Sequence, residues 1–93
     1  MAVMIRIPTT LRPMTGGASE VEAKAGRLAD VLASLEAVYP GFQERLLDNS
    51  GQLHRFVNVF VNDEDVRFLD GLDTAVQDGE TIAIIPAVAG GGF

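Results

Sequence analysis

The residues best placed to do chemistry in this sequence are the last seven, Ala87-Val88-Ala89-Gly90-Gly91-Gly92-Phe93. Glycine lacks a Cβ, so a glycine run can lie extended in a channel too narrow for any other residue, at a high cost in chain entropy. The run follows an apolar segment that reads as a strand. We therefore expect residues 87–93 to form a flexible tail that presents a terminal carboxylate to an enzyme. The alternative is a frayed chain end.

Composition limits the other kinds of chemistry. The 93 residues include no cysteine, which excludes disulfides, thiolate zinc sites and a thiol nucleophile. The net charge is −6, and the seven basic residues are scattered, so we expect no nucleic-acid partner. An acidic protein is instead steered toward enzymes with basic entrances.

The N-terminal segment 2–8 is apolar, but Arg6 and Pro8 interrupt it well before the length of a signal sequence or a membrane span. We expect no membrane partner and a cytoplasmic protein.

Neither catalytic residues nor a metal site are predicted. His54 is the only histidine and has no evident partner, so it reads as a loop or strand-start residue rather than a base. The acidic run Asp63-Glu64-Asp65 lacks the alternating ligands and the glycine of a calcium loop, and it reads as a solvated turn. No cofactor is expected.

The hydrophobic pattern predicts an α+β domain over residues 1–86. Alternation predicts strands and three-to-four spacing predicts one main amphipathic helix, with a further helical turn after Pro40-Gly41. One helix on one face of a mixed sheet is the two-layer arrangement that suits this order. The strands are expected at 2–8, 20–24, 55–61, 66–68 and 80–85, the helix at 27–39 and the helical turn at 42–47.

Three segments resemble a known family: 11–17 (Leu11-Arg12-Pro13, Thr15-Gly16-Gly17), 53–68 (from Leu53-His54-Arg55 to Val66-Arg67-Phe68) and 86–91. Over almost its full length the chain is similar to the ubiquitin-like β-grasp sulfur carriers of the ThiS/MoaD type. The likeness is greatest to the carriers that deliver sulfur for cysteine synthesis. The resemblance implies a β-grasp fold and a non-enzymatic role.

The resemblance also implies a function for the tail. Such carriers end in Gly-Gly, whose carboxylate is adenylated by an ATP-dependent E1-like activating enzyme and converted to a thiocarboxylate. The thiocarboxylate passes its sulfur to an acceptor, such as a cysteine synthase that uses pyridoxal phosphate (PLP). On this reading Gly91 carries the thiocarboxylate, and Val88, Ala89 and Gly90 are recognised in the enzyme's channel.

The end of the sequence departs from the family pattern, because Gly92-Phe93 follows Gly90-Gly91. Some family members carry a short extension that a JAMM-type metalloprotease removes, and we expect the same here. The alternative is that Gly92 is the mature end after loss of Phe93 alone.

Two further questions stay open at the level of sequence. If the three long strands are neighbours, as the family's fold implies, one exposed face carries Met4, Arg6, Phe56, Phe60, Ala83 and Ile85, a candidate docking surface. Alternatively, segment 43–52 covers part of it. The chain could also be a ubiquitin-like modifier that forms isopeptide bonds with target lysines, or a β-grasp module that only binds.

Overall fold

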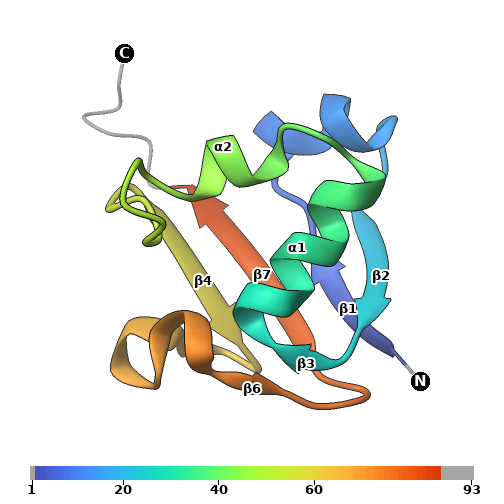
Figure 1. The fold of residues 1–93 in the computed structure, drawn as a ribbon. Coiled ribbons are helices and arrows are strands. Elements are labelled where there is room, and N and C mark those ends of the chain that lie inside the picture. Colours follow the sequence, from blue (N-terminus) through green and yellow to red (C-terminus); the bar gives the residue numbers. More distant parts are fainter. Residues whose placement is uncertain (1, 87–93) are drawn as a thin grey trace.

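A five-stranded mixed sheet forms the centre of the computed structural model, which describes residues 2–86 (Figure 1). Parallel pairing joins β1 to β7, and antiparallel pairing joins the other neighbours. The predicted mixed sheet is therefore confirmed, and its three long strands are neighbours. The strand order is β2 (Glu20–Lys24), β1 (Ala2–Arg6), β7 (Thr81–Pro86), β4 (Val57–Val61) and β5 (Glu64–Asp65).

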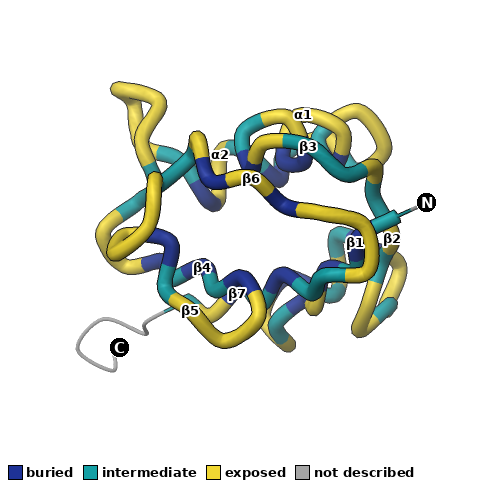
Figure 2. Tube along the Cα trace, turned by 90° about the horizontal axis from the view of Figure 1, so that it is seen from below, coloured by how far each residue is buried: buried dark blue, intermediate teal, exposed yellow. Residues whose placement is uncertain are grey.

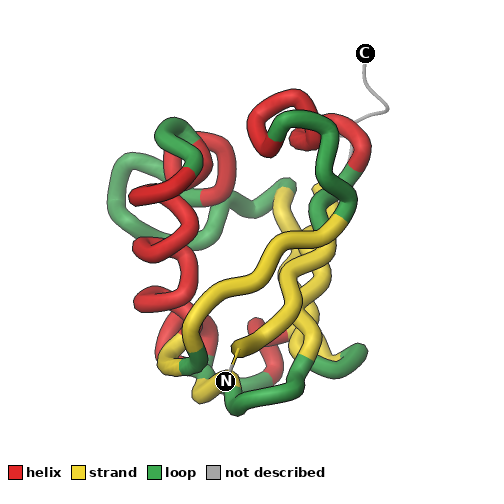
Figure 3. Tube along the Cα trace, turned by 90° about the vertical axis from the view of Figure 1, so that its right-hand side faces the viewer, coloured by secondary structure: helices red, strands yellow, loops and turns green. Residues whose placement is uncertain are grey.

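The helix α1 (Leu28–Val38) packs on one face of this sheet, as the spacing predicted (Figure 3). A short helix, α2 (Phe42–Leu46), lies on the same side (Figure 2). A second, two-stranded sheet pairs β3 (Gly26–Arg27) with β6 (Ala75–Val76), and the sequence pattern did not predict it. Three 3-10 helices complete the connections: Thr9–Thr15, Val66–Phe68 and Gly71–Asp73.

The core lies between the helices and the sheet. Alternate residues of each long strand face it, and so does one stripe of α1, because a strand has a period of two and a helix a period of 3.6 residues. The core side chains of these four elements are at most 5% exposed. They are Val3 and Ile5 from β1, Val57, Val59 and Val61 from β4, Ile82 and Ile84 from β7, and Leu28, Val31, Leu32 and Leu35 from α1.

One predicted element is wrong. Residues Val66–Phe68 form a 3-10 helix, and the short strand lies two residues earlier, at Glu64–Asp65. The reason is the tight turn at Asn62 and Asp63, both at positive φ, which returns the chain to β4 at once. The Asp65 carboxylate then accepts the Arg67 backbone N–H at 2.9 Å and starts the 3-10 helix.

The two helices are joined by the Glu36 carboxylate. It accepts the backbone N–H groups of Gly41 and Gln43, each at 2.8 Å. Gly41 has φ +101°, and a Cβ there would lie 3.1 Å from the Met14 Cε, so the link requires glycine. Hydrogen bonds from Gln43 and then Gly41 lower the pKa of Glu36 below its ordinary value.

Replacing Val59 by aspartate should unfold the domain. Val59 is fully buried, and an unpaired charge there costs about 4 kcal/mol or more, a large part of a small domain's stability. Phe60→Asp should retain most of the stability, because Phe60 points to the other face of the sheet. Thermal unfolding followed by circular dichroism measures both, and equal losses would contradict this assignment of the faces.

Glu36→Gln should lower the melting temperature at neutral pH, because a neutral amide accepts the two N–H groups less strongly than a carboxylate. A carboxyl group whose pKa is lowered by folding stabilises the fold above its unfolded pKa, and this contribution is lost as the pH falls through its folded pKa. The difference between wild type and Glu36→Gln should therefore be full above the unfolded pKa of about 4.3, and it should shrink as the pH falls through the lower pKa of the folded state. A difference that does not depend on pH would rule out this role of the charge.

Candidate functional site

The candidate tail follows β7, a strand that is paired with a neighbouring strand on each side. β7 lies between β1 and β4, and its last residue, Pro86, pairs with Val57 (Figure 1). Its side chains alternate: Ile82 and Ile84 are buried in the core, whereas Ala83 and Ile85 are not. The predicted site residues Val88, Ala89, Gly90, Gly91 and Gly92 lie outside the described residues. The fold therefore fixes the point from which they start.

Five of the predicted docking residues are brought together on the face of the sheet that lies opposite the helices. Pairing across the strands puts Arg6, Ala83 and Phe60 in one row. Met4 lies beside Thr81 in the next row, and Ile85, half-exposed, lies beside Asn58. We call this surface, made of Met4, Arg6, Phe60, Ala83 and Ile85, the outer face.

Phe56 is separate from these rows. It lies in the turn before β4, is 40% exposed, and has its ring centroid 5.3 Å from that of His54. The Arg55 guanidinium lies 5.2 Å above the ring. His54 is a loop residue, as predicted, and its Nδ1 accepts the Phe56 backbone N–H at 3.4 Å.

A polar hollow of about 410 Å³ continues the outer face beside Ala83, and sequence reasoning missed it. Asn62 lines this hollow. Its side chain is held in place because it donates to the Glu80 carboxylate at 2.7 Å and accepts the Thr81 N–H at 3.1 Å. Arg6 supplies a guanidinium, 3.7 Å from the Glu20 carboxylate. The outer face thus combines apolar side chains with a charged and hydrogen-bonding margin.

Arg67 was not predicted as a site residue, although it supports β4, which pairs with β7. Its guanidinium donates to the Asn58 side chain at 2.6 Å and to the backbone carbonyls of Val57 at 2.7 Å and His54 at 2.9 Å. Val57 is the residue that pairs with Pro86. No sequence signal could reveal these contacts, because they depend on the 3-10 helix that places Arg67.

Segment 43–52 does not lie over the outer face. Phe42 and Leu46 of α2 are buried in the core on the helix side of the sheet, and the loop after α2 continues from there (Figure 2). In that loop, hydrogen bonds from the Ser50 hydroxyl and from backbone N–H groups lower the pKa of Asp48. Asp48 therefore organises a turn.

Among residues 2–86, no three histidine, cysteine, aspartate or glutamate side chains gather as metal ligands would. None of the helices in this part of the chain is both long and apolar enough to cross a membrane. The features that the described residues offer are a candidate docking face and the point from which the candidate tail starts.

Comparisons with known proteins agree with this geometry. Residues 5–91 match the ThiS family. The chain is 57% identical to the sulfur carrier protein CysO of Mycobacterium tuberculosis, over 98% of this chain and all of that protein. It is 39% identical to the small archaeal modifier protein 3 of Haloferax volcanii, over 98% and 100% of the two chains.

Solved structures show the same fold. The Amycolatopsis orientalis BexX/CysO complex contains a chain with a TM-score of 0.90 and 48% identity, covering 94% of this chain and 97% of that one. The crystal structure of Mycobacterium tuberculosis CysO gives a TM-score of 0.88 and 56% identity, covering 92% and 99%. The expected ubiquitin-like β-grasp fold is confirmed, and the likeness to CysO supports a sulfur carrier over a lysine modifier. The chain belongs to the ThiS family.

Proposed function

We propose that this protein carries sulfur on its C-terminal glycine for cysteine biosynthesis or a related sulfur insertion. The observation that carries the proposal is the full-length identity of 57% with a sulfur carrier protein. The fold supports it, since the strand that leads to the tail is held on both sides. We place the protein in the cytoplasm, where its activating enzyme and acceptor would be.

The proposed chemistry needs two displacements, the first at the α-phosphorus of ATP and the second at the acyl carbon of Gly91. A carboxylate oxygen attacks the α-phosphate of ATP, and pyrophosphate leaves. A sulfide donor then displaces AMP from the acyl carbon and leaves a thiocarboxylate. An E1-like enzyme would catalyse these steps, and an acceptor such as a PLP-dependent cysteine synthase would take the sulfur. This chain serves as the substrate, and the catalytic groups belong to its partners.

The tail has a defined reach. Gly91 is five residues beyond Pro86, so its carboxylate can lie at most about 17–18 Å from the end of β7. We propose that Val88, Ala89 and Gly90 are recognised in the channel of the activating enzyme that leads to its active centre. A JAMM-type metalloprotease would first remove Gly92-Phe93, since a terminal phenyl ring does not fit a glycine-wide channel.

Chain length should therefore decide reactivity. We expect a chain ending at Gly91 to support ATP–pyrophosphate exchange with its activating enzyme, and the chain ending at Phe93 to be inert. The chain ending at Gly92 should react about 100-fold more slowly, because one extra residue displaces the carboxylate by about 3.3–3.6 Å. Full exchange by the chain ending at Phe93 would contradict the processing step. If the chain ending at Gly92 exchanged faster than the chain ending at Gly91, Gly92 would be the mature end.

The outer face should dock the activating enzyme. Phe60→Asp places a charge in the row formed by Arg6, Ala83 and Phe60, and we expect KM for the carrier to rise about tenfold with little change in kcat. Steady-state exchange kinetics of the chain ending at Gly91 measure this.

Ala33→Asp is the matched control, because Ala33 is exposed on α1, on the other side of the sheet. It introduces the same charge away from the outer face and should leave KM unchanged. An equal rise in KM for both variants would assign the effect to net charge and contradict docking at the outer face.

The second candidate function is lysine modification, which the Haloferax volcanii relative named a modifier protein favours. Both functions begin with adenylation, so activation alone does not separate them. Lysine-linked conjugates of this chain in cell extracts, without a free thiocarboxylate, would favour the modifier. A free thiocarboxylate without conjugates would favour the carrier.

A further inference from the structure

The strand β2 has a free edge. It is the outermost strand on one side of the sheet, and within residues 2–86 it pairs only with β1. In an antiparallel pair, every second residue directs its backbone N–H and C=O toward the partner strand. The hydrogen bond from the Ile7 N–H to the Ser19 carbonyl shows which residues of β2 these are. By that alternation Val21 and Ala23 bond to β1, whereas the backbone groups of Glu20, Glu22 and Lys24 point away from it. In the described part of the chain, no other strand pairs with this edge.

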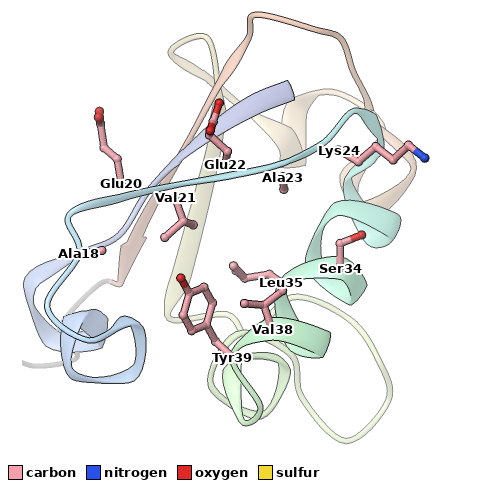
Figure 4. A pocket seen from close by; sticks show the side chains of 10 residues that line it. All are labelled: Ala18, Glu20, Val21, Glu22, Ala23, Lys24, Ser34, Leu35, Val38 and Tyr39. Atoms are coloured by element: carbon pink, nitrogen blue, oxygen red, sulfur yellow. The ribbon is translucent and has the colours of Figure 1, made fainter. Parts of the chain in front are cut away.

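An apolar groove runs beside this edge, between β2 and α1 (Figure 4). Its volume is about 440 Å³. Val21 and Ala23 of β2 point toward Leu35, Val38 and Tyr39, which come from α1 and its C-terminal end. Val38 is 67% exposed, although it is an aliphatic side chain beside other apolar groups. Apolar side chains from an added strand could pack here.

The other face of the same edge carries charged side chains: Glu20, Glu22 and, by the alternation of β2, Lys24. Glu20 and Glu22 are exposed and point away from the groove (Figure 4). Glu20 lies 3.7 Å from Arg6, and Glu22 forms no ion pair within residues 2–86. The whole chain carries a net charge of −6. A residue placed opposite Glu22 on an added strand would therefore be favoured if it were basic.

We infer that the β2 edge and the β2–α1 groove bind an extended segment of a partner protein in which apolar and basic residues alternate. The segment adds a strand beside β2, and its backbone pairs with Glu20, Glu22 and Lys24. Its apolar side chains enter the groove, and its basic side chains lie beside Glu20 and Glu22. Because β1 separates β2 from β7, a partner held here leaves the tail free to react, so the inference does not depend on the proposed function.

A second copy of this chain fits the edge less well. In the antiparallel register that pairs all five residues of β2 with those of another β2, the two Glu22 carboxylates lie directly opposite each other, and this repulsion works against the two Glu20–Lys24 pairs that the register also forms. Each copy also carries a net charge of −6. The net charge of the two copies and the Glu22–Glu22 pair therefore favour a basic partner segment over self-association.

The test uses capped peptides of about six residues, a usual strand length, and the full chain labelled with ¹⁵N. A peptide of alternating valine and lysine should bind, and it should protect the amide hydrogens of Glu20, Glu22 and Lys24 from exchange. The amides of Val21 and Ala23 should already be protected, because they bond to β1. Peptides of alternating valine and glutamate, or of alternating serine and lysine, should bind more weakly.

Two charge reversals make the test specific. Glu22→Lys should weaken binding of the valine–lysine peptide about fivefold to tenfold and strengthen binding of the valine–glutamate peptide. Glu44→Lys, on the exposed side of α2, changes the net charge equally and should alter neither affinity by more than about twofold. Circular dichroism confirms that both variants fold.

Several results would overturn the inference. They are no binding of the valine–lysine peptide at millimolar concentration, equal binding of the valine–glutamate peptide, equal effects of the two reversals, or protection outside β2. Concentration-dependent dimerisation that protects the β2 amides without peptide would assign the edge to a second copy instead.

Discussion

The packing of Ile82 and Ile84 against the helices is the interaction on which the rest of the structure depends. These two side chains hold β7 in the middle of the sheet, where hydrogen bonds to β1 and β4 fix it from both sides. A strand in this position cannot shift by one residue, because such a shift would move both isoleucines out of the core. The point from which the proposed glycine-rich tail starts is therefore fixed.

The same alternation that buries Ile82 and Ile84 creates the outer face. Ala83 and Ile85 must point away from the helices, and the pairing with β1 and β4 brings Arg6 and Phe60 beside Ala83. The helices cover only one face of the sheet, and β2 forms one edge of the sheet. The fold thus separates three surfaces: the outer face, the end of β7, and the β2 edge with its groove. Separate surfaces would allow a sulfur carrier to be bound by more than one protein.

Much of this arrangement follows from local patterns in the sequence. Alternation in 2–8, 55–61 and 80–85 predicted the three long strands and which side chains are buried, and three-to-four spacing predicted α1. Two features escaped prediction, because they depend on contacts between distant residues. The β3–β6 pair joins Gly26 to Val76, and Arg67 reaches back to Val57 and Asn58. Phe56 was assigned to the strand pattern, but the strand begins one residue later.

The central claim is that the terminal carboxylate gains sulfur, and intact-mass spectrometry tests it most directly. The chain ending at Gly91 is incubated with an activating enzyme of the ThiS-family type, ATP and a sulfide source. The account predicts that one terminal oxygen is replaced by sulfur, and that the added sulfur is lost again when a competent acceptor enzyme is supplied. A chain that shows neither an adenylate nor a gain of sulfur with any cognate activating enzyme would contradict it.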